Sequence, residues 1–495
     1  MAIGRGTTLA ALLVAACAGG GPAGDPGDAD ARIDRGTEAS GDLPGDSADD
    51  RREEAGPGET ADPPPDASPD ASPRDVQPDA SLPSNGCGDC HRNSARLLAD
   101  LEADPPPPRP LDESKGECCG GEVPPAPVHQ KVRVTADFDR DPVHGALACT
   151  DCHGGDPTAT TRREAHAGLV ADPSVPDPGD SCGRCHPEVA TTFAQSLHAT
   201  EAGKRRSVEI RAGGPLSPLV DSAYRTHCGR CHASCGQCHV SAPAPAGGGL
   251  LQGHAFVRRA PGFLTCTGCH GTRVRQEYEG RNAGIPADVH FLAGMECTDC
   301  HSGDGMHGKG GEDATHRYDV DSSPRCSDCH PDGEAFRRNP FHAVHRDELG
   351  ALLLSCQACH AAEWKGCVGC HVSLSPAGVP VSEVNEPDHV SWLGVRLGFN
   401  PRRDARHPER WVPLRRVPAA PGLFDFYGPG LLPAFDAAPT WTLATPHTIR
   451  RTTARTANCT DSCHGNRAVF LGPGDLRDYE AAANEAVLVV VPPGP

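Results

Sequence analysis

A five-residue unit, Cys-x-x-Cys-His, occurs ten times between residues 87 and 371 and constrains this chain more than any other feature. Numbered in chain order, the units contain the cysteine pairs Cys87–Cys90, Cys149–Cys152, Cys182–Cys185, Cys228–Cys231, Cys235–Cys238, Cys266–Cys269, Cys297–Cys300, Cys326–Cys329, Cys356–Cys359 and Cys367–Cys370. The histidines that follow are His91, His153, His186, His232, His239, His270, His301, His330, His360 and His371. An eleventh unit has three residues between Cys459 and Cys463, followed by His464.

The histidine after every second cysteine indicates the kind of site. C-x-x-C-H is typical of haem c attachment, in which both thiols bond to the vinyl groups and the His ligates the iron as its proximal ligand. Zinc sites also use C-x-x-C pairs, but they do not require a His directly after the second Cys, and neither does a disulfide scaffold. The sequence therefore predicts eleven haems c. At Cys459–Cys463 the alternatives are a disulfide or a decayed site.

The composition favours the same kind of organisation. Aromatic residues make up only 4% of the 495 residues, whereas Gly (57) and Pro (50) are abundant. Such a chain has little material for a conventional hydrophobic core, and its prolines interrupt long helices and strands. We expect a mostly α fold with much irregular loop, organised around stacked haems. The formal net charge of −20 comes mainly from the N-terminal part, and no basic face suggests nucleic acid.

The second axial ligand of each iron has to come from outside the units. Because the chain has only three Met, His/His ligation at low potential is expected for nearly all sites. The distal candidates among the fourteen spare histidines are His144, His166, His198, His254, His290, His307, His342, His345 and His447. His198 and His342 each lie 12 residues after a proximal His, which indicates one structural device used twice. We expect His129 and His407 to be non-ligands, and His227 is ambiguous.

The N-terminus resembles an exported lipoprotein. Residues 1–16 contain a short apolar run, too short to cross a bilayer, and Val14-Ala15-Ala16-Cys17 resembles a lipobox. We expect cleavage before Cys17 and lipidation of its thiol and amino group; the alternative is an ordinary secretory signal. The implied location is the periplasm or the cell surface. Ala18 favours the outer membrane, by resemblance to known sorting rules.

Composition and motifs divide the rest of the chain. Residues 17–86 form an acidic segment rich in Pro and Asp, which predicts a disordered linker. Residues 87–371 form the multihaem domain, interrupted by a Pro-rich insertion at 104–128, and 372–495 form a C-terminal region with the one atypical site. Cys118 and Cys119 are assigned no role.

Several strings resemble a known group of proteins. HGALACTDCHGGDP, AHAGLVADPS, CGRCHPEVATTFAQSLHA, ECTDCHSGDGMHG and SCQACHAAEWKGCVGCH resemble the octahaem tetrathionate reductase and hydroxylamine oxidoreductase superfamily, as does WTLATPHTIRRTTARTANCTDSCHGN. The resemblance covers roughly 140–371 and 440–485 and implies a helical, irregular fold around bis-His haems. It also implies that His447 is a distal ligand. Enzymes of the superfamily keep an open or Lys-ligated haem, and some cross-link it to a Tyr; no such motif occurs here.

The favoured function is electron relay in the cell envelope, because closely spaced units such as the fourth and fifth require closely spaced haems. Expected partners are other redox proteins, namely quinol-linked or periplasmic cytochromes and outer-membrane conduits, and a membrane reached through the lipid. The alternative is a reductase of nitrite, hydroxylamine, a sulfur oxyanion or a metal, which needs one five-coordinate haem beside acid/base groups. A haem-bearing filament subunit is a third class.

Overall fold

The computed structural model describes residues 86–100, 126–174, 181–229, 233–243, 246–311, 314–376, 378, 380–384, 390–464 and 466–489. The expected signal peptide, Cys17, nearly all of the linker, Cys118, Cys119, Cys231, His232 and His389 lie outside these residues. Within the described part, no helix combines the length and the apolar character needed to cross a bilayer.

Eight units in the described part form a single helical turn. They are α2 (Gly86–His91), α6 (Cys149–His153), α8 (Ser181–Cys185), α13 (Gly236–His239), α14 (Cys266–His270), α17 (Cys297–Cys300), α19 (Cys326–Cys329) and α22 (Cys356–His360). Because residues three apart share one face of a helix, each turn holds both thiols on the same side. Each helix therefore presents a two-thiol attachment face, with the His at its end.

The tenth and eleventh units differ from this pattern. Cys367 lies in strand β1 (Trp364–Val368), while Cys370 and His371 lie in β2 (Cys370–Leu374). The eleventh unit forms a π-helical turn, η9 (Thr460–His464). A π-turn closes over one more residue than an α-turn, so it accommodates the extra residue between Cys459 and Cys463.

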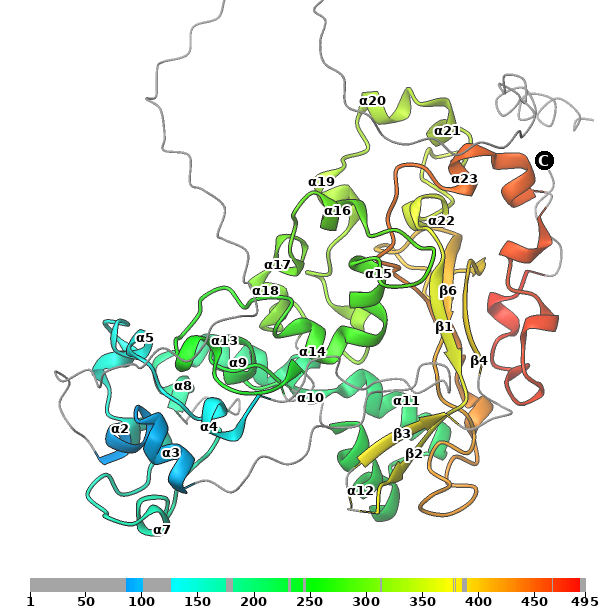
Figure 1. The fold of residues 1–495 in the computed structure, drawn as a ribbon. Coiled ribbons are helices and arrows are strands. Elements are labelled where there is room, and N and C mark those ends of the chain that lie inside the picture. The colour runs from blue at the N-terminus through cyan, green and yellow to red at the C-terminus, as the bar shows by residue number, and fades with distance from the viewer. Residues whose placement is uncertain are drawn as a thin grey trace, which may run out of the picture. The chain divides into compact units, whose positions relative to one another are not determined.

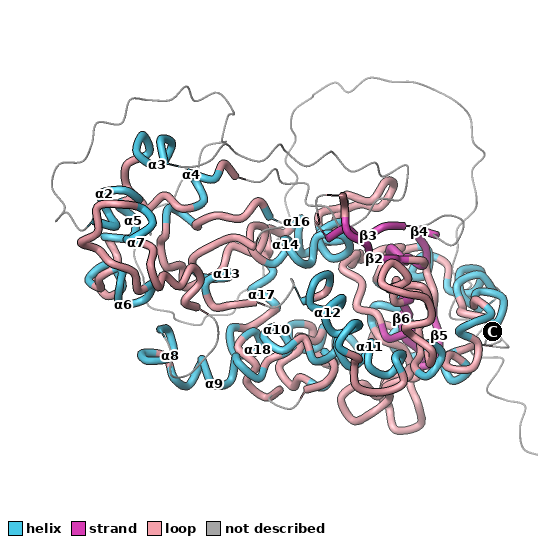
Figure 2. Tube along the Cα trace, turned by 90° about the horizontal axis from the view of Figure 1, so that it is seen from below, coloured by secondary structure: helices cyan, strands magenta, loops and turns pink. Residues whose placement is uncertain are grey.

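The remaining helices are short and connect the units. They are α3 (Ser94–Asp100), α4 (Val128–Lys131), α5 (Ala136–Asp139), α7 (Arg162–Ala165), α9 (Pro187–Gln195), α10 (Leu197–Thr200), α11 (Ala202–Ala212), α12 (Pro218–His227), α15 (Gln276–Tyr278), α16 (Val289–Leu292), α18 (Gly303–Met306), α20 (Glu334–Arg337), α21 (Pro340–Ala343) and α23 (Ala454–Ala457). Loops join these pieces over much of the trace (Figure 2).

The C-terminal region contains sheets that the sequence did not lead us to expect. The other strands are β3 (Pro380–Val384), β4 (Val390–Gly394), β5 (Leu397–Phe399), β6 (Trp411–Arg416) and β7 (Trp441–Leu443). The pairs β1–β4 and β2–β3 and the three-stranded sheet β5–β6–β7 are all antiparallel. Figure 1 shows β1, β4 and β6 side by side, with β2 and β3 next to α11 and α12.

Apolar side chains do form cores around these strands. One cluster joins Val412, Leu414, Trp441 and Leu471, and a second surrounds Trp364, which is fully buried. A third cluster packs α12 against β2 and the segment 424–435. This region is therefore held by conventional packing, to which Ala358 of the ninth unit also contributes.

Candidate haem-binding site

The histidines of the units face other histidines across a nearly constant gap. Eight such ring pairs have centroid separations between 6.0 and 6.4 Å: His91–His166, His186–His144, His153–His254, His270–His198, His239–His307, His330–His290, His360–His342 and His464–His345. In every pair one ring belongs to a unit and the other is one of the nine predicted distal candidates. The structure thus brings eight of these candidates opposite a proximal His.

This gap fits a haem iron between two imidazoles. An imidazole nitrogen binds a first-row metal at about 2.0–2.1 Å, and about 1.1 Å separates that nitrogen from its ring centre, so two rings on opposite sides of one iron have centres about 6.3 Å apart. Direct ring stacking would give a shorter distance, as between His342 and Phe336 at 3.8 Å. The observed separations match bis-His ligation.

Hydrogen bonds hold the proximal rings so that one nitrogen stays available. The Nδ1 atoms of five proximal histidines contact main-chain carbonyl oxygens, at 2.7 to 3.1 Å: His91 with Val132, His153 with Val170, His239 with Val257, His360 with Arg450 and His371 with Gly422. Such a bond fixes the tautomer with the proton on Nδ1 and leaves Nε2 as a metal ligand. The buried Nε2 of His371 has no hydrogen-bond partner in the described part of the chain.

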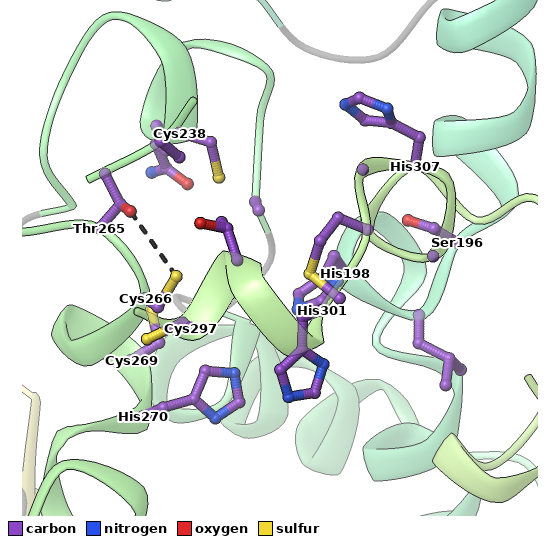
Figure 3. A pocket seen from close by; sticks show the side chains of 18 of the residues that line it. Ser196, His198, Cys238, Thr265, Cys266, Cys269, His270, Cys297, His301 and His307 are labelled. Atoms are coloured by element: carbon purple, nitrogen blue, oxygen red, sulfur yellow. Dashed lines mark hydrogen bonds between the residues drawn. The ribbon is translucent and has the colours of Figure 1, made fainter. Parts of the chain in front are cut away.

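Burial keeps several of these imidazoles neutral, which is the form that binds iron. Loss of hydration lowers the pKa of His270 and of His301 to about 4. The same cause lowers the pKa of His198 and of His447. Figure 3 shows His198, His270 and His301 in one pocket, with the thiols of Cys266 and Cys297 close together.

The seventh unit, which ends at His301, has a histidine from the C-terminal region as its neighbour. After burial, the neighbouring His447 imidazole does most to lower the pKa of His301, so the two side chains lie near each other. His447 belongs to the segment 447–450, which we call the crossing segment. Its Ile449 pairs with Ala361, its Arg450 carbonyl accepts from His360, and its main chain bonds to Asp288 and Val289. The crossing segment therefore touches the seventh, eighth and ninth sites.

Side chains of eight units, the first to the third and the fifth to the ninth, line one continuous cavity of about 3740 Å³. Pockets for single small ligands measure roughly 300–1,000 Å³, so this space is several times larger than one ligand requires. Fifteen of the sixteen histidines in the ring pairs, all except His464, line this cavity. It has the volume for a series of large cofactors.

Thiols of neighbouring units lie near one another in a definite order. Three contacts are thiol–thiol hydrogen bonds, between Cys182 and Cys235, Cys266 and Cys297, and Cys326 and Cys356. In five more pairs, burial raises the pKa of one thiol, and a nearby thiol of another unit raises that pKa further. The pairs, with the affected thiol first, are Cys87 and Cys149, Cys152 and Cys182, Cys238 and Cys266, Cys300 and Cys329, and Cys359 and Cys463. These eight pairs of thiols connect the units in the order 1-2-3-5-6-7-8-9-11, where each number is that of a unit in the sequence.

The other spare histidines have different surroundings. His227 contacts the Tyr427 hydroxyl through Nε2 at 2.7 Å, and His407 contacts Asp404 and lies edge-on to Tyr318. Neither belongs to one of the ring pairs. His129 lies in α4, and its role as a non-ligand stays a prediction.

Bare-metal and disulfide arrangements are not seen in the described residues. The cysteines there form no disulfide, and no three His, Cys, Asp or Glu side chains converge on a point that could hold a metal ion.

Comparison with known proteins supports the same cofactor class. Multiheme cytochrome MtrA of Shewanella baltica (strain OS185) is 26% identical to this chain over 128 residues. This similarity supports a multihaem cytochrome. The matched residues make up 22% of this chain and only 38% of that relative's length. No family model matches the sequence, and no solved structure is similar to it.

Proposed function

We propose that this multihaem cytochrome relays electrons along a series of bis-His haems. The observation that carries the proposal is the set of eight facing imidazole pairs, each 6.0–6.4 Å apart. When bound, each haem would supply an iron that takes up and releases one electron. The chain supplies both axial ligands, excludes water by burial and sets the order of the sites.

The same geometry weighs against the reductase alternative. A reductase of nitrite, hydroxylamine, a sulfur oxyanion or a metal needs an iron with one open position. At eight units the histidine faces a second imidazole that could fill the open position, and the His447 imidazole lies near His301 of a ninth. An open position would have to be sought at the fourth and tenth sites, at His232 and His371. The superfamily relationship that the sequence suggests also belongs to this alternative.

The wild-type protein tests the proposal directly. We expect its mass to exceed that of the polypeptide by eleven haems, and the oxidised protein to give only low-spin signals in low-temperature electron paramagnetic resonance. Cys463→Ala should weaken the covalent hold on one haem and leave the other ten in place.

A high-spin signal that shifts on adding nitrite, hydroxylamine or tetrathionate, together with turnover, would favour the reductase. Ten haems would remove the eleventh site.

We also propose that the chain is a lipoprotein of the cell envelope, attached through Cys17 and facing redox partners in the periplasm or at the cell surface. Cys17→Ser should release a soluble periplasmic protein that keeps its haems, because no unit lies before residue 87. Labelling with a fatty-acid analogue, compared between wild type and variant, measures this. Wild type without label would indicate an ordinary secreted protein.

A further inference from the structure

Two distal histidines differ from the proximal ones in the group that forms a hydrogen bond with the Nδ1 atom of the ring. Where the proximal rings contact main-chain carbonyls, Nδ1 of His144 contacts Asp141 Oδ2 and Nδ1 of His290 contacts Asp288 Oδ1, both at 2.8 Å. His144 faces His186 of the third unit, and His290 faces His330 of the eighth. Two of the eight pairs therefore have a carboxylate behind one ring.

Asp288 is buried and rigidly held. Its side chain is 2% exposed, and it caps α16 by accepting a hydrogen bond from the His290 main-chain N–H at 2.9 Å. Its second oxygen accepts from the Ile449 N–H in the crossing segment at 2.7 Å. Among the ion pairs of the described residues, none gives Asp288 a Lys or Arg partner. The His290 imidazole is therefore the one side chain that forms an ion-pair contact with Asp288 among the described residues.

Asp141 repeats the arrangement nearer the surface. Its Oδ1 accepts from the N–H groups of Val143 and His144, at 2.9 and 3.0 Å, while its Oδ2 contacts the ring. The Asp141 side chain is 22% exposed, so water screens its charge more than that of Asp288.

A carboxylate on Nδ1 changes what the ring does to an iron bound at Nε2. It draws the Nδ1 proton and makes the imidazole a stronger donor, and its charge favours the more positive ferric state. One electron enters the iron on reduction, and the Nδ1 proton stays between imidazole and carboxylate in both states. Both effects lower the reduction potential, and burial strengthens them.

We propose that Asp288 and Asp141 are positioning residues that lower the reduction potentials of the haems at the eighth and third sites. This inference rests on the proposed function. It places two haems of lowered reduction potential, at the third and eighth sites, within the order of units 1-2-3-5-6-7-8-9-11. The potential is expected to be lowered more at the eighth site.

Asp288→Asn separates this role from a purely structural one. Asn caps helices as well as Asp and its Oδ1 can still accept from the ring, but it carries no charge, and its Nδ2 cannot accept the bond from the Ile449 N–H. We expect unchanged haem mass and low-spin state, and an upward shift of one of the eleven one-electron steps in a potentiometric titration. Asp141→Asn should give a smaller upward shift of a different step. Asp288→Ala should in addition change the resonance signal of one haem, because the ring loses its anchor.

The matched control is Asp404→Asn. Asp404 contacts the Nδ1 of His407 at 3.3 Å and also accepts from the His407 main-chain N–H, as Asp141 does from His144, but His407 belongs to none of the ring pairs. We expect no shift there. Titrations of Asp288→Asn and Asp141→Asn that superimpose on wild type, or an equal shift in Asp404→Asn, would overturn the proposal. If Asp288→Asn does not accumulate, the more exposed Asp141→Asn decides. A haem missing from the wild-type mass would instead count against the proposed function.

Discussion

Without attached haem, the chain from residue 86 to about 360 is expected to lose its fold. Water would fill the cavity of about 3740 Å³, and the apolar side chains that line it would lose the contacts that a haem makes. We expect this loss to exceed a typical net stability of roughly 5–15 kcal/mol. Short helices of four or five residues cannot compensate, because isolated turns of helix are unstable in water.

The measurement is limited proteolysis and far-ultraviolet circular dichroism of the chain produced with and without the haem-attachment machinery. We expect rapid cleavage between residues 86 and 360 in the haem-free chain. Cys463→Ala, made with the machinery present, is the control and should resist cleavage like wild type. A haem-free chain with the native cleavage pattern and a cooperative unfolding transition would show that the haems are not the core.

Replacing a distal histidine should change one haem in eleven. His198 faces His270 at 6.4 Å, and His342 faces His360 at 6.2 Å. His198→Ala and His342→Ala should each convert a single haem to high-spin and leave the haem count unchanged, because the thioethers and the proximal ligand remain. Electron passage should slow in both variants.

His407→Ala serves as the control for these substitutions, since its ring faces Tyr318 rather than a proximal histidine. Electron paramagnetic resonance of the oxidised proteins, with spin quantitation, gives the result. A fully low-spin His198→Ala protein would mean that this imidazole is not a ligand, and the bis-His assignment of the sixth site would be lost.

The units and most of their opposite histidines could be predicted from the sequence, but not which histidine faces which. The positions of His198 and His342 after their preceding units are indeed equivalent, each in the second of two short helices, α10 and α21. Yet each ring faces a later unit rather than the one that precedes it. Chain spacing indicates a shared local device, whereas the pairing depends on how distant segments pack.

The C-terminal sheets could not be predicted from the sequence for a different reason. Arg416 is 3% exposed and paired with fully buried Glu480 at 2.7 Å, and Arg415 is paired with buried Glu277. Charged residues at buried positions of β6 break the apolar alternation by which a strand is recognised. They are stable there because each charge has a partner, a condition that only the folded chain reveals.

The crossing segment has a consequence for maturation. The seventh unit ends at His301, and its neighbour His447 is made 146 residues later (447 − 301), after the eighth, ninth and tenth units have been synthesised. At the ninth site His342 precedes His360, so both of its ligands exist as soon as that unit emerges. During export from the N-terminus, the seventh site is therefore expected to wait with one imidazole until the C-terminal residues arrive. If His447 ligates the seventh haem, as proposed, that site can be completed only after residue 447 has been exported.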